Sequence, residues 1–243
     1  MSTPSDWRAL LASGAFDTQA LRLPAGSVVD LRGADLQGLD LRNMGIFAWD
    51  LSAADLRGAT FEENFIARCR IQGARFDAPP DRLAAILDLW SGNVSGTSTF
   101  SEALLDGLDL RDRDLGKLTL ERCSLRGAKF GQARFESLDL SQSDLGGAQM
   151  SGMQGGDINL QHTDLSDTRL DGSSFSSLRL DMAQGTSSSW VGVNVERVVA
   201  RHAKLSKADF SESAWQEGAF ANCELHGLKI QQADFGQVLG LPS

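Results

Sequence analysis

The sequence predicts a four-sided β-solenoid, an all-β fold in which the chain winds in stacked coils and turns a corner at every fifth position. Two observations carry this prediction: a bulky apolar residue recurs at every fifth position, and other features recur at every twentieth position. A period of five fits neither an α-helix, with about 3.6 residues per turn, nor a strand, whose side chains alternate. Four pentapeptides close one coil.

The apolar positions, called centres below, form two runs. The second run begins at Phe100 and continues at every fifth residue to Phe235, except at Gly155, Gly185 and Ala200. The residue two places before a centre is usually small, so two side chains of each five point inward and three point outward. The first run consists of Leu31, Leu36, Leu41, Ile46, Leu51, Leu56, Phe61, Ile66, Ile71 and Phe76.

A rhythm of four pentapeptides supports four sides per coil. On one side the position two before the centre is bulky, at Leu118, Leu138, Ile158, Leu178 and Val198. On the next side the same position is small, at Ala103, Cys123, Ser143, Thr163, Ala183, Ala203 and Cys223. A feature that belongs to one side can recur only once per coil, so each coil contains four pentapeptides.

Segments such as ADLQG, ADLRG, ARFES, SDLGG, TDLSD and ADFGQ resemble the pentapeptide-repeat family, whose motif is A(D/N)LxX. The resemblance covers residues 28–77 and 98–237, and it implies a right-handed quadrilateral parallel β-helix. We expect a single solenoid domain over 1–243. Its parts are an N-terminal cap (1–27), a first repeat run (28–76), a helical insert or loop (77–99), a second repeat run (100–237) and a C-terminal tail (238–243).

The two ends of a solenoid need caps because they expose apolar side chains and unpaired backbone groups. Residues 5–14 predict a short N-terminal helix, which Ser5 caps and Gly14 ends, with Trp7, Leu10 and Leu11 on one face. At the other end, the tail can close the last coil with Val238, Leu239 and Leu241.

The insert predicts a second short helix. Pro79 and Pro80 break the coil, Asp81 can cap the helix, and Gly92 ends it. Its apolar side chains fall on one stripe, formed by Leu83, Ile86, Leu87 and Trp90.

The stripe of the insert must be buried, and we expect it to pack over Phe47 and Phe65. The alternative is that the stripe is presented to a partner, since exposed apolar patches mark interaction sites. The insert replaces two sides of one coil and lengthens the chain there, which predicts that the solenoid continues through it.

Composition narrows the function classes. The net charge of −9 and the pI near 4.8 argue against non-specific nucleic-acid binding, which needs clustered Lys and Arg. The acidic balance permits contact with a basic protein surface, or it serves solubility alone.

Cys69, Cys123 and Cys223 are far apart and predict neither a disulfide framework nor a zinc site. Without a signal peptide or a membrane span, we expect a cytoplasmic protein.

Catalytic motifs are missing from the sequence, and we expect no enzyme activity, no metal and no cofactor. His162 and His202 fall on the same side but two coils apart, too far for one metal ion. The many Asp residues just before centres are interpreted as corner residues, whose side chains hydrogen-bond the nearby turn backbone. Repeats of this kind also supply no concave pocket.

The resemblance extends to the topoisomerase-protecting branch of the family, which comprises quinolone-resistance proteins and self-immunity proteins of organisms that make topoisomerase poisons. It implies a DNA mimic that binds DNA gyrase or topoisomerase IV. A loop projecting from the solenoid is a feature of that branch, which makes the insert a candidate contact through Asp81, Arg82, Asp88 and Trp90. A candidate acidic face consists of Asp35, Asp55, Asp106, Asp144, Asp164 and Asp167.

Two departures from that branch keep an alternative open. The tail is short for the C-terminal helix through which those proteins dimerise, so both a monomer and a homodimer are compatible with the sequence. Arg57, Arg126 and Lys204 interrupt the acidic face. The alternative is a scaffold or regulator that binds a different protein, because the motif encodes the fold and not the partner. Neither hypothesis involves direct contact with nucleic acid or membrane.

Overall fold

The computed structural model describes Leu11 and residues 29–42, 45–61, 65–67, 69–77, 81–92 and 97–241. The chain forms two compact units, Met1–Ser91 and Gly92–Ser243, which are described separately. Of the expected N-terminal cap (1–27) and its helix (5–14), only Leu11 lies within the described residues, and it is helical and buried.

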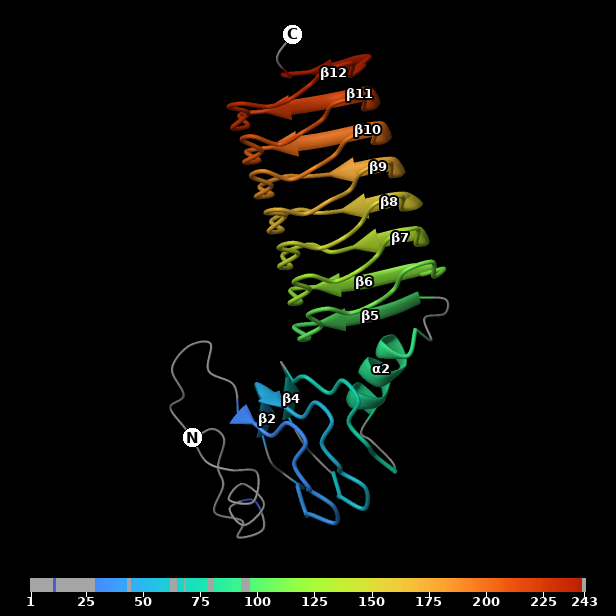
Figure 1. Ribbon diagram of the computed structural model, residues 1–243, viewed down its shortest axis with the longest axis vertical. Coiled ribbons are helices and arrows are strands. Elements are labelled where there is room, and N and C mark those ends of the chain that lie inside the picture. The colour runs from blue at the N-terminus through green and yellow to red at the C-terminus, as the bar shows by residue number, and fades with distance from the viewer. Residues whose placement is uncertain are drawn as a thin grey trace. The chain divides into compact units, whose positions relative to one another are not determined.

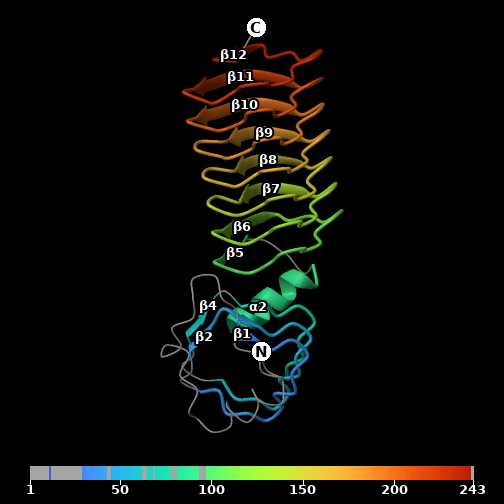
Figure 2. The same ribbon diagram turned by 60° about the vertical axis from the view of Figure 1, so that its left-hand side comes forward.

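The second unit is a parallel β-solenoid, as predicted. One eight-stranded parallel sheet runs along the stack of coils in the order β12-β11-β10-β9-β8-β7-β6-β5. Figure 1 and Figure 2 show these strands stacked in chain order, from green to red. The strands are β5 (Thr97–Ser101), β6 (Lys117–Glu121), β7 (Arg134–Asp139), β8 (Gln154–Asn159), β9 (Ser174–Arg179), β10 (Asn194–Arg201), β11 (Ala214–Ala221) and β12 (Gln237–Leu239).

The register confirms the coil length. Phe100 pairs with Leu120, Leu138 with Ile158, and Val195 with Trp215, and each pair is separated by four pentapeptides. Isolated bridges on the other sides keep the same offset, for example between Asp144 and Asp164. Each inward side chain therefore stacks on the equivalent one of the next coil, and the centres of β6 to β11 are buried except at Gly155.

Three corners of each coil are tight turns. At Leu145–Ala148 the amide of Ala148 donates to the carbonyl of Leu145 (2.8 Å), and Gly147 has a φ of 68°. This is the geometry of a type II turn, which needs a left-handed residue at its third position. At the fourth corner, the longer strands β7 to β11 continue through without a tight turn.

Hydroxyl groups satisfy backbone carbonyls inside the coils. The Ser143 hydroxyl donates to the carbonyl of Leu120 (2.6 Å), and the Ser213 hydroxyl donates to that of Trp190 (2.7 Å). Thr163, Thr168 and Ser173 repeat this bond, each to the residue 23 positions earlier. Ser and Thr at the small inward positions are thus buried without leaving an unpaired polar group.

Aromatic rings gather in the C-terminal coils. The rings of Trp215 and Phe220 stack at 5.5 Å between centroids, and Phe210 lies 4.7 Å from Trp215. Trp190 and Phe235 extend the cluster through edge contacts. The sequence predicts columns of rings along single sides, and the contacts also run between sides, because the interior is narrow enough for rings from two sides to meet.

The first unit also contains parallel pairs with an offset of one coil. β1 (Val29–Asp30) pairs with β3 (Trp49–Asp50), and β2 (Gly45–Phe47) pairs with β4 (Phe65–Ala67). Leu31, Leu51 and Ile71 are buried, as expected of stacked centres.

The insert contains the predicted helix, α2 (Asp81–Trp90), and Gly92 follows it with a φ of 74°. Among the described side chains of the helix, those of residues 85–90, Ile86 and Leu89 are buried and Leu87 and Trp90 are half-buried, so Leu89 joins the buried face in addition to the predicted stripe. The side chains of Leu83, Phe47 and Phe65 lie outside the described residues. Packing of α2 over Phe47 and Phe65, and continuity of the solenoid through the insert, stay predictions.

The C-terminal tail departs at Leu239 from the expected closure of the last coil. Residues Gln237–Leu239 form β12, which pairs in parallel with β11 and extends the sheet by one strand. Val238 continues the inward column and is half-buried, but Leu239 points outward and is 71% exposed. The alternation of a strand turns neighbouring side chains to opposite faces, so these two residues cannot both cover the end.

Candidate protein-binding surfaces

Most Asp side chains just before the centres accept hydrogen bonds from the backbone of the nearby turn, as predicted. The amide of Gly146 donates to Oδ1 of Asp144 (3.0 Å), and the amide of Ser166 donates to Oδ1 of Asp164 (2.9 Å). Asp209 and Asp234 accept from the amide two residues later in the same way. These carboxylates stabilise turns of the coil.

Arginine neutralises several of these carboxylates. Arg57 donates two side-chain bonds to Asp55, with Nη2 at 2.6 Å from Oδ2, and these bonds lower the pKa of Asp55 to about 2. The Asp30–Arg32 and Asp109–Arg111 pairs have the same geometry. The sequence motif Asp-Leu-Arg therefore encodes an ion pair on the outer surface.

The candidate acidic face is divided between the units. Asp35 and Asp55 are bridge partners in the first unit, and Asp55 is paired with Arg57. In the second unit Asp144 and Asp164 lie on adjoining coils, with exposed Asp167 at the corner beside them. Arg126 lies 2.9 Å from Asp144, and Asp106 accepts a bond from the Ser124 hydroxyl. Asp144, Asp164 and Asp167 are thus brought together, but Arg126 interrupts the face.

The candidate insert residues are described only in part. Asp88 is exposed on α2, and Trp90 is half-buried. The Trp90 indole nitrogen is buried without a hydrogen-bond partner in the described part of the chain. The side chains of Asp81 and Arg82 lie outside the described residues.

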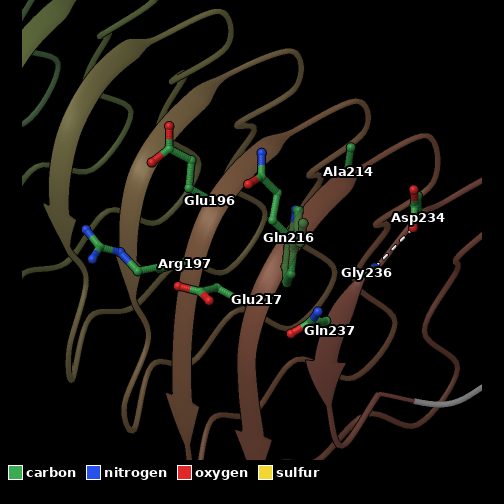
Figure 3. Close-up of a pocket in the computed structure, with 9 residues that line it drawn as sticks. Glu196, Arg197, Ala214, Gln216, Glu217, Asp234, Gly236 and Gln237 are labelled. Atoms are coloured by element: carbon green, nitrogen blue, oxygen red, sulfur yellow. Dashed lines mark hydrogen bonds between the residues drawn. The ribbon is translucent and has the colours of Figure 1, made fainter.

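A groove runs over the outside of the second unit. It lies on the side that we call the groove side, formed by the outward side chains of residues 154–157, 174–177, 194–197, 214–217 and 234–237. Its larger hollow, of about 660 Å³, is lined by residues from three successive coils. In Figure 3 Glu196 and Gln216 form one row, and Arg197, Glu217 and Gln237 form a second row beside it.

A second hollow of about 200 Å³ continues the groove toward β8. Both hollows share Glu196, Ala214 and Gln216. The small outward residues Ser174, Ser176 and Ala214 leave the depression open, and the buried centres Phe175, Val195 and Trp215 contribute to its lining.

Polar side chains of the groove side form fewer hydrogen bonds than those of the other sides. Elsewhere, side chains on adjoining coils bind each other: Asp139 with Asn159, Asp171 with Ser189, and Asp209 with Lys229. On the groove side from Gln154 to Gln237, the outward side chains form one hydrogen bond with described residues, from the Gly236 amide to Asp234. The hydroxyl, amide and carboxylate groups there are available to a ligand.

The expectation that these repeats supply no concave pocket is wrong, because the groove is hollowed into the outside of the second unit. The signal of the groove is present in the outward positions, because one column contains the small residues Ser174 and Ala214 between the longer Gln154, Asn194 and Asp234. Catalytic motifs and charge patterns do not reflect side-chain size along one column of the coils, so they do not indicate this depression.

The described residues contain no group of three or more His, Cys, Asp or Glu that could hold a metal ion. Among the described helices, none has the length and hydropathy of a membrane span.

Three comparisons place the chain among known proteins. A family model described as pentapeptide repeats, in eight copies, matches residues 119–152. No curated protein matches the chain.

Solved structures of similar proteins include HetL from the cyanobacterium Nostoc sp. strain PCC 7120, a pentapeptide repeat protein involved in heterocyst differentiation regulation. It is 21% identical, with 90% of this chain and 94% of HetL covered and a TM-score of 0.31. Another is a trypsin-treated variant of QnrB1, a plasmid-mediated fluoroquinolone resistance protein. It is 18% identical, with 85% and 91% covered and a TM-score of 0.29.

The matched residues 119–152 lie within the second unit, where β6 and β7 belong to the eight-stranded parallel sheet. The same coil of four pentapeptides continues on both sides of them, from β5 to β12. By the family match at residues 119–152 and this coil geometry, the second unit contains repeats similar to those of the pentapeptide-repeat family.

Proposed function

We propose that the protein is a non-catalytic solenoid that binds DNA gyrase or topoisomerase IV in place of duplex DNA and protects the enzyme from topoisomerase poisons. The observation that carries this proposal is the density of carboxylates on the second unit. Residues 97–241 contain 20 Asp or Glu and 14 Lys or Arg, a net charge of −6.

The carboxylate density resembles that of DNA. Eight strands at about 4.8 Å span about 34 Å, a length over which B-DNA carries about 20 phosphates. Carboxylates of the second unit match that number, and most are on the outside of the coils. A DNA-binding surface lined with Lys and Arg would be attracted to such a rod.

The second candidate function is that of a scaffold or regulator that binds a different protein. Ion pairs favour this candidate, because Arg111 and Arg126 cancel the charge of Asp109 and Asp144 at the surface. A surface with interspersed signs imitates a phosphate backbone less closely than its carboxylate count suggests, and it suits a partner with its own mixed charges.

A supercoiling and poison-rescue assay with purified gyrase tests the first candidate. We expect the protein to inhibit supercoiling and to relieve cleavage induced by a fluoroquinolone or another poison. If it does neither at concentrations up to tens of micromolar, binding to gyrase is excluded as its function and the scaffold role is favoured. The same assay with topoisomerase IV covers the second enzyme.

A further inference from the structure

We propose that the groove side of the second unit binds an extended segment of a protein partner that carries Lys or Arg side chains. This inference refines the proposed role in protein binding by assigning the contact to one side of the solenoid. It does not depend on the partner being a topoisomerase.

The shape of the groove fits an extended chain. The two hollows share residues and together reach from β8 to β12, which is four strand spacings or about 19 Å. An extended peptide rises about 3.3 Å per residue, so the groove has room for about six residues. Hydroxyl and amide groups of Ser174, Ser176, Asn194 and Gln216 face outward along it, without partners in the described part of the chain.

The charge of the larger hollow selects a basic segment. Glu196, Glu217 and Asp234 contribute three carboxylates, against the single guanidinium of Arg197. In Figure 3 Glu196 and Glu217 belong to neighbouring coils and to the two different rows of the hollow, with Arg197 in the row of Glu217. A Lys or Arg side chain of the bound segment can pair with one of these carboxylates while its aliphatic part covers the wall beside Trp215.

The same charges argue against other occupants. Phosphates of a nucleic acid would be repelled by the three carboxylates. A second copy of this chain carries the same net charge of −9, so its approach to this side is also unfavourable. A basic protein segment is the occupant that satisfies both the shape and the charge.

To test this proposal, a displayed library of random decapeptides is selected for binding to the full-length protein. We expect enrichment of peptides that contain Lys or Arg. The Glu196→Gln/Glu217→Gln variant should bind the selected peptides about tenfold more weakly, because the two carboxylates face the ligand. The matched control is Glu212→Gln/Glu224→Gln, which changes the net charge equally at exposed sites on two other sides and should bind as the wild type does.

A second variant tests the shape of the groove. Ala214 is exposed and lines both hollows, so Ala214→Trp should fill the groove and abolish peptide binding while thermal unfolding stays unchanged. Ala221→Trp, an exposed site outside the groove, is its control. The inference is wrong if the library yields no binders, if the binders lack basic residues, or if they bind the groove variants as tightly as the wild type. Gyrase inhibition by the wild-type protein is measured separately, so that the two proposals can fail independently.

Discussion

The ring of Phe135 occupies the space beside Gly155 on the next coil, where any Cβ would overlap with it. Phe135 also lies 6.0 Å from Phe175, two coils away, so the two rings meet across the glycine. Gly155 therefore interrupts the run of bulky centres because its neighbours fill its place.

Gly155→Leu restores the repeat pattern, but we expect it to destabilise the protein. The added side chain would overpack a filled interior, which typically costs about 1–3 kcal/mol. Urea unfolding followed by circular dichroism measures this loss. Adding Phe135→Ala should recover part of the lost stability by making room. A Gly155→Leu variant as stable as the wild type would contradict this account of the packing.

The pentapeptide spacing predicted the solenoid, the recurrence at every twentieth position predicted its coil length, and the apolar stripe with its flanking breakers predicted the helix at Asp81–Trp90. Each of these predictions rests on a regular spacing or a breaker residue that can be read directly along the chain. Gly155 appears in the sequence as a break, and its explanation requires the ring of a residue one coil away. The sequence shows that this centre is small, and the reason is the ring of Phe135 on the neighbouring coil.

The candidate acidic face stays a prediction, and the positions of its neighbouring cations become clear only in the folded chain. Asp55 and Asp144 are outward, as the repeat requires, but their charge depends on cations that lie two residues later or one coil away. The groove depends on side-chain size in columns from successive coils. Ion pairs between coils and the depth of the groove depend on residues from several coils, so they become apparent only in the folded solenoid.

Ser188 fixes the indole of Trp190 in the core. Trp190 Nε1 donates to the Ser188 hydroxyl (2.7 Å), which donates to the carbonyl of Gly185 (2.6 Å). Ser188→Ala should reduce the free energy of unfolding by about 1–3 kcal/mol, because it leaves the buried indole N–H without a partner. Exposed Ser187→Ala is the control and should change stability by less than about 0.5 kcal/mol. Equal effects of the two substitutions would rule out this role.

Asp181 should make the stability depend on pH. Burial of this carboxyl, which is 9% exposed, opposes ionisation, but hydrogen bonds from Arg201 and Gln161 outweigh burial and lower its pKa. Its folded pKa therefore lies below the unfolded value of about 3.9. The stabilisation is present above about pH 4 and is lost as the pH falls through the folded pKa.

Urea unfolding at several pH values between neutral and strongly acidic tests this dependence. Asp181→Asn should lower stability most at neutral pH, and its difference from the wild type should shrink on acidification. Arg201→Met should raise the pKa of Asp181 and move the acid loss of stability to higher pH. Parallel curves for the wild type and Asp181→Asn would show that this carboxyl does not contribute in the way described.

The insert offers a test of the gyrase hypothesis. Deleting residues 79–92 should abolish protection and leave the β-type circular dichroism intact, if the insert is a contact rather than a structural element. Because Ile86 and Leu89 of α2 are buried, the deletion can also unfold part of the chain. Asp88→Lys separates these outcomes, since Asp88 is exposed and its reversal should leave thermal unfolding unchanged while weakening protection. If gyrase is protected equally by Asp88→Lys and the wild type, Asp88 is not part of the contact.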